Sequence, residues 1–252
     1  TKLNGGTPIS DGPFRNGSMY LTYTNEGMPI GAFWGYKTDG LIQTQEQLNA
    51  VKRADFQPNA ELGDVLFVDT NGDGKLDSSD RCMIGNPIPD IIYGINMGMA
   101  WKGFDLNLQF GGTIGNQIFN AMRYYTYFPN DITNKDRALM NYWTPNNTNT
   151  DIPRLTATDV NDNDRFSDMY VENGTYFRLR NAQLGYTLPA SLTQRIKLQK
   201  VRFYVSGQNL FTISSYSGMD PEVGQSSSLS RGIDYGIYPQ NISFTGGINV
   251  TF

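Results

Sequence analysis

The chain has 252 residues, of which 38% are hydrophobic and 13% are aromatic, and its formal net charge is −4. A low apolar share with many aromatic residues fits a protein with one apolar and one wet face, as a transmembrane barrel has, and not a disordered chain. The sequence contains no histidine, which excludes histidine-based triads and histidine-ligated zinc, and no basic stripe points to nucleic acid as a partner. No run of about 20 apolar residues is present, so no transmembrane helix is predicted.

Six stretches are predicted to be β-strands, because apolar and polar residues alternate along them with a period of two. In chain order they are 20–37, 91–100, 104–110, 175–187, 201–206 and 242–252. The first is interpreted as one strand that is interrupted around Gly27-Met28-Pro29. Residues 101–103 are predicted to be the tight turn of a hairpin. The fourth strand changes phase, which indicates a β-bulge near Arg180 or Asn181.

The connections between these strands alternate strictly between short and long. The short ones are 101–103 and 188–199, the latter with a helical turn, and the long ones are Thr38–Asp90, Thr113–Gly174 and Ser214–Gln240. Outer-membrane barrels have short periplasmic turns and long extracellular loops. We therefore expect the three long segments to lie outside the cell, and Phe252 to lie at the periplasmic rim. About six strands cannot close such a barrel, so we expect further strands from additional chain.

Residues 69–80 match the spacing of the twelve-residue calcium loop, with Gly74 at the sharp turn. The predicted oxygen ligands are Asp69, Asn71, Asp73, the carbonyl of Lys75, Asp77 and Asp80. Asp80 stands where a regulatory EF-hand has glutamate, and no flanking helices are predicted. We therefore expect a structural calcium ion that fixes an extracellular loop, and no switch. The alternative is a metal-free Asp/Asn/Gly-rich turn that is stabilised by its own side chains.

Aromatic residues are dense in and next to the long connections. The candidates for substrate contact are Trp34, Tyr36, Tyr124, Tyr125, Tyr127, Tyr142 and Trp143. The amide-rich stretch 146–150 lies nearby in sequence. Rings beside amides suit sugar binding, because rings stack on the C–H faces of sugars while amides bond hydroxyl groups. The alternative for each ring is an aromatic girdle at the membrane interface, or packing within a loop.

The loop carboxylates raise the possibility of a glycan-cleaving enzyme. Such an enzyme needs two suitably spaced carboxylates, and Asp159 and Asp168 are candidates. These acids lie in Asn/Asp-rich turns, so solvated loop acids are the interpretation we favour, and we expect no enzyme. A further alternative is a secreted or surface calcium-binding β-domain that binds carbohydrate without transporting it.

Several stretches, in the same order along nearly the whole chain, resemble one family. They are residues 26–40, 63–80, 84–94, 101–106, 173–181, 205–211 and 218–222, with the closing Phe252. Together they resemble the C-terminal region of SusC-like (RagA/SusC-type) TonB-dependent transporters, which are outer-membrane proteins of Bacteroidota.

This resemblance implies an all-β fold, an antiparallel transmembrane β-barrel of roughly 22 strands with long extracellular loops and an N-terminal plug. Residues 1–252 would form the C-terminal part of that barrel, without the plug. The resemblance also implies import of glycans, oligosaccharides or peptides, powered by TonB through segments that are absent here. The expected partners are a SusD-like lipoprotein over the extracellular mouth, outer-membrane lipid, and an oligosaccharide or peptide substrate.

Overall fold

The structure is a computed structural model that describes residues 4–14, 19–127, 134–224 and 227–252. The chain divides into two compact units. The first, here called the loop unit, comprises Thr1–Ile88, Gln117–Glu172 and Glu222–Ile237; the second, here called the wall, comprises Pro89–Asn116, Asn173–Pro221 and Tyr238–Phe252. Among the helices of the described residues, none has the length and apolar content needed to cross a membrane.

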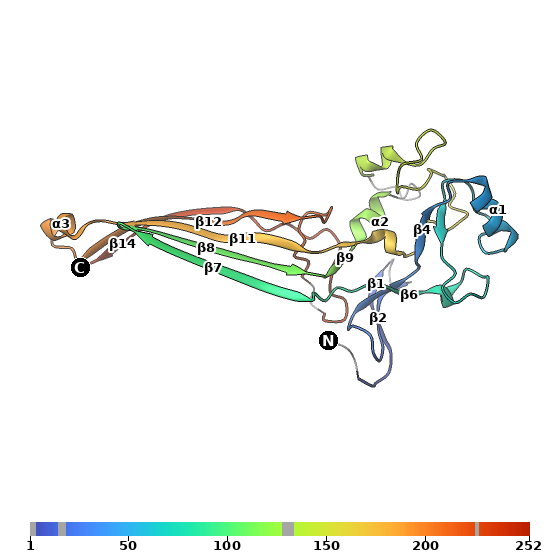
Figure 1. Cartoon of the computed structure of the whole chain (residues 1–252), viewed down its shortest axis with the longest axis horizontal. Coiled ribbons are helices and arrows are strands. Elements are labelled where there is room, and N and C mark those ends of the chain that lie inside the picture. Colours follow the sequence, from blue (N-terminus) through green and yellow to red (C-terminus); the bar gives the residue numbers. More distant parts are fainter. Residues whose placement is uncertain (1–3, 15–18, 128–133, 225–226) are drawn as a thin grey trace. The chain divides into compact units, whose positions relative to one another are not determined.

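The wall is a single antiparallel sheet of five strands in the order β14-β12-β11-β8-β7 (Figure 1). Its strands are β7 (Ile91–Trp101), β8 (Phe104–Ile114), β11 (Tyr176–Thr187), β12 (Lys200–Ser214) and β14 (Ser243–Thr251). These strands are long, with 9 to 15 residues each. The alternating pattern therefore predicted all five strands, although several of the predicted strands are shorter than the observed ones.

The first two wall strands form the predicted hairpin, with Trp101 opposite Phe104. Lys102 and Gly103 make the two-residue turn, and their φ angles are 47° and 90°. Two consecutive residues with positive φ are typical of the turn whose twist matches that of an antiparallel hairpin. The glycine is required here because a Cβ at Gly103 would come within 2.8 Å of the Thr187 carbonyl oxygen.

The predicted bulge in the fourth strand is confirmed. The pairing of β11 with both of its neighbours shifts between Leu179 and Asn181. Leu179 pairs with Phe110 before the shift, and Ala182 pairs with Leu108 after it. Because paired residues point to the same side of a sheet, the extra residue keeps one apolar face continuous along β11.

The short connections of the wall meet at one end of the sheet (Figure 1). Thr187 pairs with Arg202 and Lys200 pairs with Thr251 near this end, where the β7–β8 turn also lies. The predicted helical turn between β11 and β12 is present as α3 (Ala190–Thr193) and a following 3-10 turn (Gln194–Ile196). The long connections leave from the opposite end of the sheet, as the alternation of loop lengths predicted.

One face of the wall is apolar and is not covered by this chain. Ile242, Phe244, Ile248 and Val250 expose 58%, 78%, 61% and 43% of their surface. Met99, on the other edge of the sheet, exposes 65%. A soluble sheet would bury such a face against another layer, since an exposed apolar area of this extent marks a contact with another molecule or with lipid.

Among its described residues, the loop unit contains three small sheets, whose orders are β1-β2-β3-β6, β10-β9-β13 and β4-β5. The strands are β1 (Ile9–Phe14), β2 (Met19–Thr24), β3 (Ala32–Gly35), β4 (Thr38–Leu41), β5 (Val65–Phe67), β6 (Cys82–Gly85), β9 (Gln117–Asn120), β10 (Val171–Asn173) and β13 (Ile233–Asp234). The helices are α1 (Gln45–Arg53) and α2 (Ala121–Tyr127), with 3-10 turns at Ser78–Asp80, Arg137–Asn141 and Asp168–Tyr170. The long connections are therefore folded, and they are built from strands too short to give a clear alternating pattern.

The prediction of one interrupted strand over residues 20–37 is wrong. β2 and β3 pair with each other antiparallel, Thr22 opposite Phe33, so the chain reverses direction between them. Gly27 and Gly31 have φ angles of 75° and 69°, the left-handed conformation that glycine adopts without a steric cost. The described part of the wall therefore has five strands where the sequence predicted six, because the first predicted strand belongs to the loop unit.

Three hydrophobic clusters are found among the residues of the loop unit that the structure describes. The first contains Phe14, Leu21, Phe33, Phe119, Ala121, Tyr124, Phe166, Tyr170 and Ile233. The second contains Tyr36, Leu41, Phe56, Val65, Phe67 and Trp143, and the third contains Ile42, Leu48 and Ala60. The first two clusters join residues far apart in sequence, and the third lies within residues 42–60. The described part of the loop unit therefore has hydrophobic cores of its own, and none of these clusters includes a residue of the wall sheet.

Candidate functional site

The face of the wall opposite the apolar one carries polar and charged side chains. On it, Arg202 of β12 forms an ion pair with Asp105 of β8, with 2.9 Å between Nε and Oδ1. These strands are separated by β11, and Gly185 lies in the gap: a Cβ there would come within 2.5 Å of both side chains. Glycine at this position lets the two charges meet across the intervening strand.

A second ion pair lies at the other end of this polar face. The Arg178 guanidinium donates to the Asp220 carboxylate at 2.6 Å, and both side chains are at least 96% buried. The other carboxylate oxygen of Asp220 accepts the backbone N–H of Gln240 at 3.0 Å. Asp220 thereby ties both ends of the last long connection to β11.

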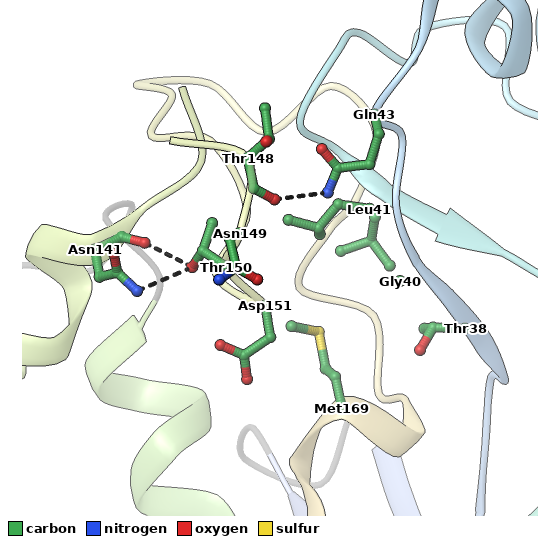
Figure 2. Close-up of a pocket in the computed structure, with 11 residues that line it drawn as sticks. Thr38, Gly40, Leu41, Gln43, Asn141, Thr148, Asn149, Thr150, Asp151 and Met169 are labelled. Atoms are coloured by element: carbon green, nitrogen blue, oxygen red, sulfur yellow. Dashed lines mark hydrogen bonds between the residues drawn. The ribbon is translucent and has the colours of Figure 1, made fainter. Parts of the chain in front are cut away.

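The loop unit contains a cavity of about 650 Å³ (Figure 2). On one side it is lined by residues of β4 and the segment after it, including Thr38, Gly40, Leu41 and Gln43. The other side is formed by Asn141 and the segment Thr148–Asp151. The volume lies within the range of about 300–1,000 Å³ that is typical of small-molecule pockets.

Hydrogen bonds connect the two sides of this cavity at one rim. The Gln43 side chain donates from Nε2 to the Thr148 carbonyl at 3.1 Å and accepts the indole N–H of Trp143 at 2.8 Å. The Trp143 backbone N–H donates to the carbonyl of Ile152 at 2.9 Å. Hydrogen bonds between the chain's own residues thus fix this rim.

Buried amides hold the segment that follows the cavity against β5. Asn163 accepts the backbone N–H of Val65 at 2.8 Å and donates to Asp64 at 3.0 Å. Asn161 donates to Asn163 at 2.8 Å and accepts from Gln57 at 3.0 Å. Since buried polar groups are costly when unpaired, this network fixes one arrangement of the segment.

The structure distributes the seven aromatic candidates over the loop unit and places none of them in the lining of the cavity. Tyr36, Tyr124 and Trp143 are buried, with 9%, 4% and 6% of their surface exposed. Trp34, Tyr125, Tyr127 and Tyr142 are half-buried. The three buried rings pack within the loop unit, which is the alternative to substrate contact that the sequence left open.

The buried rings act through packing. The Trp143 ring covers Gly63, where a Cβ would lie 2.2 Å from Cε3. Tyr124 contacts Phe14 edge-to-face with 4.9 Å between ring centroids. The lining residues Asn149, Asp151 and Met169 were not among the sequence candidates, although the amide-rich stretch 146–150 was the signal that pointed to this region.

Residues 69–80 adopt a compact loop in which carboxylates accept backbone N–H groups. Asp69 accepts from Gly72 at 2.6 Å and from Gly74 at 2.8 Å. The Gly74 N–H is the main reason why the pKa of Asp69 lies below its usual value. The pKa of Asp77 is also lowered, chiefly by the backbone N–H of Ser79.

These contacts bear on the predicted calcium ligands in two ways. Gly72 and Gly74 have φ angles of 77° and 78° and lie in open space, so the predicted sharp turn is present. Within the described residues, however, no three acidic or cysteine side chains come together closely enough to hold a metal ion. Asp80 instead caps the loop, accepting from the backbone of Thr70 and Asp77 at 3.0 Å. Calcium binding here stays a prediction.

The two carboxylates considered for glycan cleavage have structural partners. Asp168 accepts the backbone N–H of Thr38 at 3.0 Å and its hydroxyl at 2.6 Å. Asp159 accepts the backbone N–H of Asp164 at 3.1 Å, and burial raises its pKa. Both side chains thus help to shape the turns in which they lie.

Comparisons with known proteins agree with this architecture. No family model matches the chain. It is 39% identical over 237 residues to the TonB-dependent receptor P3 of Formosa agariphila, and 29% identical over 198 residues to the TonB-dependent receptor SusC of Bacteroides thetaiotaomicron. These matches cover 90% and 78% of this chain but 22% and 18% of the relatives. The chain therefore spans about a fifth of the length of these two relatives.

The fold is also similar to solved structures of the RagAB peptide importer. The open-open and closed-closed states both give a TM-score of 0.69 at 26% identity over 92% of this chain. The match covers 23% and 24% of those chains. The chain is thus part of a TonB-dependent receptor, a class whose members are receptors and transporters and not enzymes. Within that class it belongs to the SusC-like group and corresponds to its C-terminal portion.

Proposed function

We propose that the protein to which this chain belongs imports oligosaccharides or peptides across the bacterial outer membrane. In this account the wall is a section of a closed barrel of roughly 22 strands, with its apolar face in lipid and its polar face toward the interior. The loop unit lies outside the cell, where it contacts the substrate and a SusD-like lipoprotein. TonB would power transport through segments outside these residues.

The observation that carries this proposal is the two-sided wall. Its apolar face is left open by its own chain, with Phe244 78% exposed, while its opposite face holds the Asp105–Arg202 ion pair. Only a closed barrel or a helix satisfies the backbone inside a bilayer, so the edges β7 and β14 need neighbouring strands. The similarity to TonB-dependent receptors supports the proposal that the rest of the protein provides the neighbouring strands and that TonB provides the energy.

Uptake by whole cells tests the proposal. A strain in which the full-length gene is deleted should lose uptake of fluorescently labelled oligosaccharides or peptides that the wild type takes up, and expression of the full-length gene should restore it. A second strain that lacks TonB should show the same loss, because transport is powered through it. Unchanged uptake of every probe in the deletion strain would contradict the proposal.

A further inference from the structure

We infer that the cavity of the loop unit is a binding site for an uncharged oligosaccharide. This inference rests on the proposed import function and names the class of molecule that one of its sites recognises. Three observations support this class of ligand. They are the neutral polar and aliphatic groups of the lining, the lack of unpartnered charge among the described lining residues, and the irregular edge of β4 next to the cavity.

The lining offers neutral hydrogen-bonding groups beside aliphatic side chains. Thr148 and Asn149 are exposed, and their side chains have no hydrogen-bond partner within the described residues. Leu41 and Met169 line the same space with apolar atoms (Figure 2). Amides and hydroxyls both donate and accept, as sugar hydroxyls do, and the aliphatic groups can pack against sugar C–H faces.

Charge inside the cavity is balanced. Asp151 is the charged residue of the described lining, and its carboxylate is paired with the Arg123 guanidinium. This pairing leaves no unpartnered charge among the described lining residues for either an anionic or a cationic ligand. The lining therefore favours a ligand that carries no charge.

An extended peptide is disfavoured by the edge of β4. Peptides commonly bind by adding a strand to a regular sheet edge through main-chain hydrogen bonds. β4 has four residues, its pairing with β5 is interrupted between Thr38 and Leu41, and Gly40 has a left-handed φ of 75°. The Thr38 N–H is already donated to Asp168 at 3.0 Å. Recognition must therefore come from side chains, which suits an oligosaccharide.

Direct binding to the purified full-length receptor tests the inference. The probes are maltohexaose, xylohexaose, mannohexaose and laminarihexaose, with hexagalacturonate as the acidic probe and a Gly/Ser decapeptide as the peptide probe. We expect at least one neutral hexasaccharide to bind, and the Thr148→Ala/Asn149→Ala double variant to bind it at least tenfold more weakly. The control is Asn146→Ala, an exposed amide of the same segment that does not line the cavity. It should bind as the wild type does.

Three results would overturn the inference: no neutral hexasaccharide binds, the double variant binds as tightly as the control, or hexagalacturonate or the decapeptide binds in preference. Asn149→Trp, which places a bulky indole in the cavity lining, should weaken binding at least tenfold if the inference holds, and binding equal to that of the wild type would contradict it. Uptake separates this test from the proposed function. If the double variant imports the oligosaccharide as the wild type does, the inferred cavity site is rejected and the proposed transport function is not. If the wild type imports none of the probes, the proposed transport function is rejected.

Discussion

The wall and the loop unit differ in the exposure of their apolar side chains. In the loop unit, Phe33 and Phe119 are fully buried in a cluster that the chain itself supplies. In the wall, Phe244 and Trp101 expose 78% and 69% of their surface. The loop unit is thus folded around hydrophobic cores of its own. The apolar face of the wall has no such cover and must contact lipid or another protein. Because overall composition is an average over both regions, it does not reveal that their apolar side chains lie in different environments.

The largest loss of stability is expected from a change in the buried ion pair of the wall, between Arg178 and Asp220. Asp220→Asn leaves the Arg178 guanidinium buried without its carboxylate, and breaking a buried ion pair costs about 3–5 kcal/mol. We expect the last long connection to detach from β11 and to become sensitive to protease in the full-length receptor. Proteolysis of intact cells measures this. Protection equal to that of the wild type would show that the ion pair does not anchor the connection.

A charge on the apolar face should sharpen the contrast between the two sides of the wall. Leu108→Arg places a cation on the face that we assign to lipid, which costs about 2–4 kcal/mol near the middle of a bilayer. Asn107→Arg, its neighbour on the polar face, is the matched control and should change the stability by about 0.5 kcal/mol or less. Urea unfolding of the receptor in phospholipid vesicles measures both. Equal costs for the two variants would count against a lipid-facing side.

In the loop unit a smaller change should disturb a core directly. Gly63→Ala places a methyl group against the Trp143 ring at a residue whose φ is 86°. Gly40→Ala imposes a similar left-handed strain, with φ 75°, but in open space. We expect Gly63→Ala to destabilise the loop unit by about 1–3 kcal/mol more than Gly40→Ala, the usual cost of overpacking. Hydrogen exchange of residues 56–67 reports the difference, and identical protection in the two variants would contradict it.

The smallest expected effect concerns the predicted calcium loop. If calcium binds, EGTA should reduce hydrogen-exchange protection of residues 69–80, and Asp69→Ala or Asp73→Ala should remove both the bound metal and this response. Asp39→Ala, an exposed acid of the loop unit, is the control. Metal analysis of the purified receptor that finds no calcium, with no response to EGTA, would leave the metal-free turn as the explanation.

The sequence predicted the wall better than the loop unit for a physical reason. Long strands with one apolar and one polar face repeat with a period of two, so even the bulge at Arg180 was visible as a change of phase. The strands of the loop unit have two to six residues, and their burial depends on partners far away in sequence. The β2–β3 turn was therefore interpreted as an interruption.

The cavity could not be predicted as a site for the same reason. Gln43 and Thr148 meet across a separation of 105 residues, and no local pattern encodes that contact. Trp143 and Tyr124 were chosen because they are aromatic, yet packing decides whether a ring is available to a ligand. The amides of residues 146–150 were noticed as a composition, but which of them line a cavity depends on the fold.

The most direct test of the account is to measure which solvent each face of the wall contacts. Single cysteines at Ser243, Phe244, Thr245, Gly246, Gly247 and Ile248, in the full-length receptor with Cys82→Ser, can carry spin labels in phospholipid vesicles. We expect alternation along β14. Labels at Phe244, Gly246 and Ile248 should collide with oxygen dissolved in lipid, and labels at Ser243, Thr245 and Gly247 should collide with a water-soluble nickel complex. Uniform access of the nickel complex to all six positions would contradict it.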